Sequence, residues 1–241
     1  MKPQFSILHA TLGRPEKAAR AMCLWRDRAR EPKAVEYIVA VNSDDSTIPK
    51  LYQAFAEVFD PAKAFWGTRM VGGEFKGSAE AWNEAAKGCH GEILIQGQDD
   101  IEPPQDWDVS LSERYLKEAS DRVFIAVSDG YRTGKAADLC CTAIMSRGYA
   151  EMEGHFLFPG YLSVYSDDDV TIRALGNAKE GKSVFVDARD LVFRHRHHYH
   201  DKAVPFDVTY AKENSDEAYK VGQTLFTARN KRFLEMGLKT W

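Results

Sequence analysis

Residues 91–107 constrain the fold of this chain more than any other segment. The segment opens with an apolar run, residues 93–95, that is mostly β-branched and too short for a helix, so it predicts a buried strand. The run stops at Gly97, and Asp99 and Asp100 follow shortly before two prolines, which cannot donate to a sheet ladder. The sequence therefore predicts a strand that holds adjacent carboxylates at its carboxyl end.

The order of the other segments places this strand in a parallel sheet. Up to the Asp pair, β-prone runs alternate with helical stretches, as in a sheet whose crossovers are helices. They are residues 5–10, 15–30, 37–41, 48–58, 64–71, 79–87 and 91–100. In such sheets, ligands bind in the crevice outside the carboxyl ends of the strands.

The second half of the chain continues the α/β pattern without a second domain boundary. Strands are predicted at 123–127, 139–145, 184–186 and 191–193, and helices at 109–119 and 166–176, the latter stopping near Gly176. We therefore expect one α/β domain over residues 1–204, with a mostly parallel central sheet flanked by helices. Residues 205–241 are expected to form a helical C-terminal extension that packs on the same domain.

Composition excludes several classes of protein. The net charge of −4 and the pI of about 6.0 give no general attraction to nucleic acid or anionic lipid. The four cysteines show no CxxC spacing, which disfavours a zinc site or a disulfide framework and indicates a reducing, cytoplasmic location. No apolar run approaches the roughly 20 residues of a membrane helix, so no integral membrane segment is expected.

The Asp pair suggests a metal. Two carboxylates in a crevice suit a hard divalent cation, and Mg²⁺ or Mn²⁺ often shares its coordination shell with substrate phosphates. Asp99 and Asp100 therefore predict a Mn²⁺ or Mg²⁺ site that holds a diphosphate. The alternative is an acidic turn that only caps the strand.

Further polar groups follow the other predicted strands. Thr11 and Arg14 end the first strand, and a guanidinium group matches phosphate oxygens, although a surface arginine in a turn is the simpler interpretation. Residues 42–45 could hydrogen-bond a base or ribose, but Asn, Asp and Ser are common in turns. Asn83 in the middle of a helix is mildly unfavourable and hints at a polar partner.

Two clusters remain in the second half. Residues 167–169 are consecutive carboxylates whose repulsion would raise their pKa values, as a general base requires, or which simply complement a helix dipole. His195 and His197 follow a β-prone run, and on a strand their spacing puts them on one face, where they could complete the metal shell of Asp100. Alternatively, this stretch is a basic loop that contacts phosphate, or plain surface.

The order of these clusters resembles that of glycosyltransferase family 2. FSILHATLGRPEKA is similar to the family's opening strand and T-x-x-R segment. GSAEAWNEAAKGCHGEILIQGQDDIEPPQDW is similar to its N-x-A, G-E-x-(apolar) and DxD block, and YSDDDVTIRALG to its E-D-x-D-(apolar)-x-x-R-x-x-x-G segment. The resemblance spans about residues 5–200 and implies the GT-A fold, an α/β domain that binds nucleotide-diphospho-sugars.

The resemblance also implies a role for each matching residue. Thr11 and Arg14 would lie near the diphosphate, Asn42 and Asp44 near the base or ribose, and Asn83 and Asp99 would help to bind the donor; Asp100 and His195, or His197, would be the metal ligands, and Asp167 or Asp168 the catalytic base. Two positions depart from the family pattern, since Gln98 stands at the first carboxylate of DxD and Ser166 at the usual Glu.

The function implied is a metal-dependent, inverting glycosyltransferase of the hexosyltransferase type, with a UDP-sugar as the default donor. The acceptor hydroxyl could belong to a glycan, a small molecule or a modified nucleic acid; the basic, aromatic stretch RHRHHYHDK makes modified DNA a lesser alternative. A nucleotide-sugar hydrolase and a non-catalytic nucleotide-sugar-binding module remain as rival interpretations. A nucleotidyltransferase is disfavoured, because TLGRP stands where that class has a G-x-G-T-R-rich loop.

Overall fold

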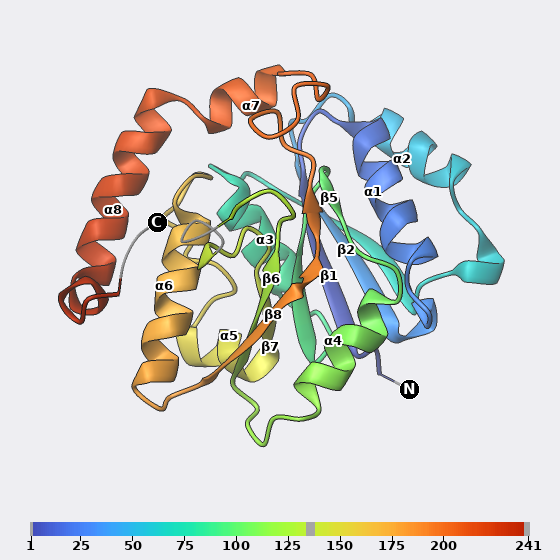
Figure 1. The fold of residues 1–241 in the computed structure, drawn as a ribbon. Helices are drawn as coiled ribbons and strands as arrows, with labels where there is room; N and C mark the ends of the chain where they lie inside the picture. The colour runs from blue at the N-terminus through green and yellow to red at the C-terminus, as the bar shows by residue number, and fades with distance from the viewer. Residues whose placement is uncertain (1, 134–137, 239–241) are drawn as a thin grey trace.

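A seven-stranded sheet in the order β3-β2-β1-β4-β7-β6-β8 forms the centre of the computed structural model, which describes residues 2–133 and 138–238 (Figure 1). The strands are β1 (Phe5–Thr11), β2 (Val35–Asn42), β3 (Gly67–Gly73), β4 (Ile93–Gly97), β6 (Val123–Ser128), β7 (Ile144–Ser146) and β8 (Val184–Val192). All run parallel except β7, which is antiparallel to both of its neighbours. The expectation of a mostly parallel sheet in an α/β fold is confirmed.

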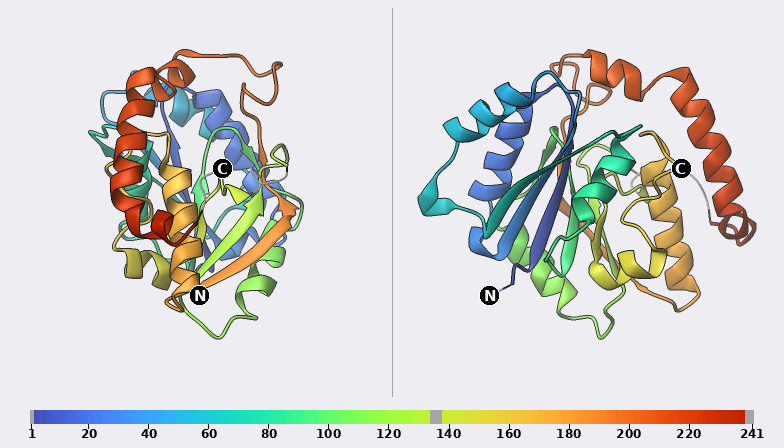
Figure 2. Two further views of the ribbon diagram at one scale, coloured as in Figure 1. Left: turned by 60° about the vertical axis from the view of Figure 1, so that its left-hand side comes forward. Right: turned by 180° about the vertical axis from the view of Figure 1, so that it is seen from behind.

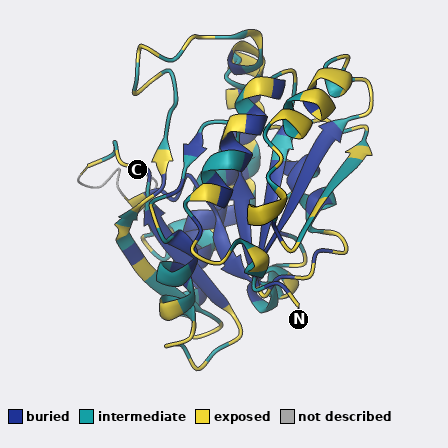
Figure 3. Cartoon of the chain, turned by 90° about the vertical axis from the view of Figure 1, so that its right-hand side faces the viewer, coloured by how far each residue is buried: buried dark blue, intermediate teal, exposed yellow. Residues whose placement is uncertain are grey.

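Helices cover both faces of this sheet (Figures 1 and 2). One face packs against α1 (Pro15–Asp27), α2 (Ile48–Glu57) and α4 (Trp107–Tyr115), and the other against α3 (Ser78–Ala86), α5 (Arg147–Glu153), α6 (Ser166–Lys179) and α8 (Asp216–Glu235). Side chains alternate between the two cores, since Ile7 faces the first and Leu8 the second. The central strands are buried on both faces, whereas the edge strands β3 and β8 are only partly covered (Figure 3).

Tryptophans fix the segment that follows the Asp pair. Trp107 is fully buried, packs edge-on against Trp25 at 5.1 Å between ring centroids, and donates its indole N–H to the Trp25 carbonyl at 2.9 Å. Between β4 and this anchor, the short strand β5 (Ile101–Glu102) pairs antiparallel with β9 (Arg194–His195). This pairing brings the histidine stretch to the Asp pair, although the two are far apart in the sequence.

Three sequence predictions differ from the structure. The strand expected over 139–145 is reduced to β7, because upstream amides bond side chains instead of a ladder: Cys140 N–H donates to Thr171 Oγ1 at 3.1 Å and Ala143 N–H to Gln96 Oε1 at 2.8 Å. The strands expected at 184–186 and 191–193 form one irregular strand, β8. The helix α6 continues past Gly176, whose missing Cβ would lie 2.3 Å from the Phe233 ring, so this glycine permits close packing of α8 and does not stop the helix.

The C-terminal arm, residues 205–238, consists of a loop, α7 (Val208–Glu213) and α8. It arches over the end of the sheet where β1, β2 and β4 finish, and α8 descends alongside α6 (Figures 1 and 2). In the described part of the chain, no helix is both long and apolar enough to span a lipid bilayer.

Candidate active site

A cavity of about 900 Å³ lies between the sheet and the C-terminal arm. We call its lining at the ends of β1, β2 and β4 the floor; it comprises Thr11, Asn42, Asp99 and Asp100. The lining from α7 and α8 is the roof; it includes Tyr210, Glu213, Tyr219 and Phe226. The first turn of α6 closes one side. Parallel strands end at one edge of the sheet, and this is why polar groups from distant parts of the chain meet there.

Asp99 is turned toward the strand ends and is occupied by protein partners. Its carboxylate contacts His9 Nε2 at 2.9 Å, accepts a hydrogen bond from Thr11 Oγ1 at 3.2 Å and lies 3.9 Å from Arg14 Nη1. His9 is fully buried and also contacts the Tyr37 hydroxyl at 2.5 Å. Asp99 therefore links Thr11 of the floor and the neighbouring Arg14 to β4.

Asp100 faces the histidines and the roof. Its Oδ2 accepts a hydrogen bond from the Tyr210 hydroxyl at 2.8 Å and lies 3.5 Å from His195 Nε2. The carbonyl of Asp100 accepts the Arg196 amide at 2.7 Å, which continues the β5–β9 pairing. The His197 ring lies 5.2 Å from that of His195 and 4.6 Å from that of Tyr210, although β9 ends at His195. The three predicted metal ligands therefore lie near one another.

The charges of these groups are strongly coupled. Burial would raise the pKa of Asp100, but the charge of His195 and the Tyr210 hydroxyl hold it well below its usual range. Burial would lower the pKa of His195, but Asp100 raises it above the ordinary value. Burial and the charge of His195 lower the pKa of His197 to about 4, so that at neutral pH its imidazole is unprotonated and able to bind a metal.

The donor set fits a divalent cation completed by other ligands. Among the described residues, no three His, Cys, Asp or Glu side chains converge tightly enough to form a metal site by themselves. His195 Nδ1 is buried and has no hydrogen-bond partner in the described part of the chain, so its ring is not locked in place by a second bond. One carboxylate and nearby imidazoles, with diphosphate oxygens and water, suit the partly filled protein shell that Mn²⁺ or Mg²⁺ accepts.

Arg14 is predicted to contact phosphate, but in this structure it binds the C-terminal arm. Its guanidinium donates to both carboxylate oxygens of Asp207, at 3.0 and 2.5 Å, and lies 4.1 Å above the Tyr210 ring. Lys17 contacts the same carboxylate at 2.9 Å. Sequence reasoning missed Asp207 and Tyr210; the only local signal is Asp207 as a capping residue before a short helix.

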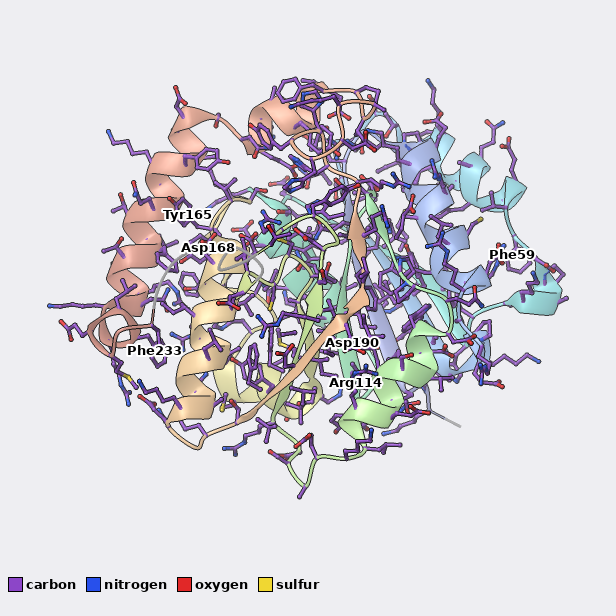
Figure 4. All side chains as sticks on the ribbon, viewed as in Figure 1. Phe59, Arg114, Tyr165, Asp168, Asp190 and Phe233 are labelled. Carbon is purple, nitrogen blue, oxygen red and sulfur yellow. The ribbon has the colours of Figure 1, made fainter. Side chains whose placement is uncertain are left out.

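The acidic turn of α6 lines the cavity with both Asp167 and Asp168. Tyr165, directly before it, has a φ of +69°, which is costly for a bulky residue, and such strain is common where a site needs a particular backbone direction. Figure 4 shows Tyr165 and Asp168 on the side of α6 that faces the arm, and the Tyr165 ring packs 5.8 Å from Phe226 of α8.

A buried cluster lies behind Asp167. The Cys141 thiol contacts Asp167 Oδ2 at 3.7 Å and receives Arg132 Nη1 at 2.8 Å, and Arg132 also pairs with Asp129. Burial and the charge of Asp167 raise the pKa of Cys141 well above its ordinary value, so the thiol stays protonated at neutral pH. Sequence reasoning missed this cluster, since none of its members stood in a recognisable motif.

The remaining predicted donor residues are placed differently. Asn42 lines the cavity and donates to the Phe75 carbonyl at 3.3 Å. Among the described residues, neither Asp44 nor Asn83 lines it; the neighbouring Asp45 accepts the Gly13 amide at 2.8 Å. Asn83 has the expected polar partners, but they are backbone groups: its Nδ2 donates to the Ala79 carbonyl at 2.7 Å and its Oδ1 accepts the Phe156 amide at 2.9 Å.

No protein-family model and no curated protein matches this sequence, but solved structures match its fold. The mannosyltransferase PcManGT from Pyrobaculum calidifontis, in complex with GDP-Man and Mn²⁺, superposes with a TM-score of 0.66 at 18% identity, over 96% of this chain and 65% of that one. Glucosyl-3-phosphoglycerate synthase from Mycobacterium tuberculosis, in complex with Mn²⁺, UDP and phosphoglyceric acid, gives 0.60 at 13% identity, over 96% and 78%. S. aureus TarS 1–349 in complex with UDP gives 0.56 at 14% identity, over 80% and 59%.

The chain has the GT-A fold. It spans less than two thirds of the mannosyltransferase and TarS structures, at 65% and 59% of their lengths. The fold expected from the resemblance is therefore confirmed. In a GT-A domain, the cavity described above is at the carboxyl edge of the sheet, where this architecture places its ligands.

Proposed function

We propose that this protein is a metal-dependent, inverting glycosyltransferase of the hexosyltransferase type, which moves a sugar from a nucleotide-diphospho-sugar to an acceptor hydroxyl. The observation that carries the proposal is the gathering of Arg14, the Asp100–His195 pair and the acidic turn of α6 around one cavity. Such a cavity offers a cation for phosphate, ligands for a metal and a base within a single space.

The donor would bind along the floor. Arg14 and Thr11 would contact the diphosphate, and Asn42 the base or ribose. Asp44 lies outside the cavity lining and would contact only a part of the base or ribose that extends beyond it. Asn83 and Asp99 would support these contacts indirectly, since their side chains bond protein groups. A UDP-sugar is the default donor, and the GDP-Man bound to the mannosyltransferase makes a GDP-sugar the second to test.

Asp100, His195 and His197 would hold the divalent cation, Mn²⁺ or Mg²⁺. When bound, the cation supplies Lewis-acid charge that neutralises the leaving diphosphate. Mn²⁺ accompanies the nucleotide in two of the structural neighbours. His195 and the Tyr210 hydroxyl lower the pKa of Asp100 against the effect of burial and keep it ionised, which is the state that binds a cation.

Asp167 or Asp168 would remove the proton from the acceptor hydroxyl while its oxygen bonds to the anomeric carbon. The bond from that carbon to the diphosphate breaks, and its electron pair leaves with the diphosphate. One displacement inverts the configuration at that carbon, so no side chain has to act as a nucleophile. The acceptor could be a glycan, a small molecule or, as a lesser alternative, modified DNA whose phosphates contact Arg194, Arg196 and Lys202.

We also propose a cytoplasmic location, because all four cysteines are free thiols. Residues 1–204 would form the catalytic unit and residues 205–241 its extension.

The modified-DNA acceptor has a test of its own. An affinity for DNA that does not fall with added salt would rule this acceptor out.

The decisive test is calorimetric titration with UDP, GDP, CDP and TDP, with and without Mn²⁺, on the wild type and Asp100→Ala. We expect one nucleotide to bind only with Mn²⁺, and Asp100→Ala to weaken that binding roughly 100-fold. Metal-independent binding, or binding that survives the substitution, would contradict the proposal. A hydrolase differs from a transferase because it consumes the donor at full rate without an acceptor.

A non-catalytic nucleotide-sugar-binding module is the second candidate. Gln98, at the first DxD position, donates to the Cys141 carbonyl at 3.2 Å, and Ser166, at the usual Glu, donates to the Ser163 carbonyl at 2.7 Å. Both departures from the family motif are therefore occupied by backbone contacts. A module predicts that Asp167→Ala and Asp168→Ala leave nucleotide binding intact and have no transfer activity to remove.

A further inference from the structure

The C-terminal arm pairs with Arg14, the cation that the proposed function assigns to the diphosphate, and with the neighbouring Lys17. Asp207 accepts two hydrogen bonds from the Arg14 guanidinium and one contact from Lys17, as described above. A carboxylate and a phosphate present similar oxygens to a guanidinium fork, so they compete for the same donor geometry. The Arg14 side chain is only 10% exposed, which leaves little room for both anions at once.

The same short segment also contacts Asp100, the proposed metal ligand. The Tyr210 hydroxyl donates to Asp100 Oδ2, and the face of its ring lies beneath Arg14. Asp207 caps α7 by accepting the Tyr210 amide at 3.0 Å, which ties the two residues to each other. The first turn of α7 and its cap therefore contact both Arg14, the proposed phosphate-binding group, and Asp100, the proposed metal ligand.

The two helices of the arm are held in different ways. Asp169 of α6 anchors α8, since it accepts Asn230 Nδ2 at 2.6 Å and the Arg229 guanidinium at 3.2 Å. The segment that leads into α7 keeps its apolar side chains in water, with Phe206 52% and Val208 82% exposed. Apart from the buried Tyr210 ring, polar contacts hold α7 in place, and a phosphate and a cation that bind the same groups can replace them.

We propose that residues 206–210 are an intramolecular competitor of the nucleotide, in which Asp207 stands in for the diphosphate on Arg14 and Lys17 and Tyr210 holds Asp100 in place of the metal. This inference rests on the proposed function of the site. The donor and its metal bind the fraction of molecules in which α7 has released the floor, while α8 stays anchored to α6. The measured dissociation constant is then the intrinsic one divided by that fraction.

Two substitutions test this competition without disturbing the helix. Asp207→Asn removes the charge but keeps the cap, because asparagine caps helices as well as aspartate does. Tyr210→Phe removes the hydroxyl but keeps the ring beneath Arg14. Asp216→Asn, at an exposed position in the first turn of α8, removes the same charge from the arm elsewhere and serves as the matched control.

Calorimetric titration with UDP, GDP and pyrophosphate, each with Mn²⁺, should show at least about fivefold tighter binding to Asp207→Asn and Tyr210→Phe than to the wild type. Asp216→Asn should bind as the wild type does. Wild-type binding that Asp207→Asn leaves unchanged or weakens would overturn the competition but leave the proposed function standing. An equal gain in Asp216→Asn would also overturn it, because the gain would then reflect net charge.

If neither the wild type nor either variant binds any of these ligands, the donor site itself is refuted and the competition falls with it. Hydrogen exchange distinguishes an arm that the nucleotide displaces from an arm that closes over the nucleotide, because the two predict opposite changes in the exchange rate. Amides of residues 206–213 should exchange faster when UDP and Mn²⁺ are bound, because α7 is displaced. Slower exchange would show that the arm closes over the nucleotide and would overturn the proposal.

Discussion

The floor of the cavity is built from the ends of a buried parallel sheet, whereas its roof is built from α7 and α8, which follow the last strand. Each floor residue ends or follows a strand that is buried on both faces, as Ile7 on one face of β1 and Leu8 on the other show. Polar contacts of Asp207 and Tyr210 hold α7 in the roof, whereas α8 is held by Asp169 and by its buried Phe226 and Phe233 rings. The difference teaches that one cavity can combine a wall fixed by apolar packing with a wall that polar contacts hold in part, and walls of the second kind open at lower free energy.

The largest effect is expected at the acidic turn, where floor and roof meet. Asp167→Asn and Asp168→Asn are each compared with the wild type in a transfer assay. The variant that removes the base should lower kcat by roughly 100- to 10,000-fold, because proton transfer from the acceptor is lost. The other should change kcat by less than about tenfold. Nucleotide binding serves as the control and should be unaffected in both; full activity in both variants would contradict a base in this turn.

The floor should be sensitive to cavities in its core. Ile95→Ala, in the middle of β4, should lower the free energy of unfolding by about 3 kcal/mol, since it removes packing that the surrounding strands cannot recover. Urea unfolding followed by fluorescence gives the value. We expect β1, β4 and the arm to lose protection against hydrogen exchange together. Loss confined to the arm would contradict the distinction between a rigid floor and a movable roof.

In the roof, we expect substitutions to cause local unfolding of α8 without unfolding the sheet. Asp169→Ala leaves Asn230, Arg229 and Tyr161 without their shared acceptor and should destabilise the anchoring of α8 by about 2 kcal/mol. Exchange of α8 amides should accelerate while that of β4 amides stays the same. Lys231→Ala, which removes an exposed pair with Glu235 on the same helix, is the control and should have almost no effect.

The contrast between floor and roof also explains what the sequence could predict. The floor follows from local rules: apolar runs define the strands, and Thr11, Asn42 and Asp100 stand where those runs stop. The contact between Arg14 and Asp207 joins positions 193 residues apart. The hydrophobic periodicity of a sequence does not predict which distant loop will cover a cavity. Gly176 was misread for a related reason, because the approach of Phe233 is invisible in the sequence around the glycine.

The smallest effect concerns the pH dependence of the roof. Glu213 of α7 lines the cavity, and the described residues give its carboxylate no hydrogen-bond donor. Burial raises its pKa to about 7, opposed by Arg14 and reinforced by Asp100, Asp99 and Asp207. A folded-state pKa above the ordinary value of 4.5 means that this group stabilises the closed arm below about pH 4.5 and progressively less as the pH rises through 7. Because the side chain is partly exposed, solvent screening reduces the effect to about 1 kcal/mol.

Hydrogen exchange of α7, corrected for the intrinsic pH dependence of exchange, should therefore report more frequent opening at pH 8 than at pH 6. Glu213→Gln, which stays neutral, should open equally often at both values and less often than the wild type at either. The exchange of β4 should show no such difference, because its protection depends on apolar packing that does not titrate. If Glu213→Gln retained the full pH dependence, another group would control the roof, and the histidines beside Asp100 would be the next to substitute.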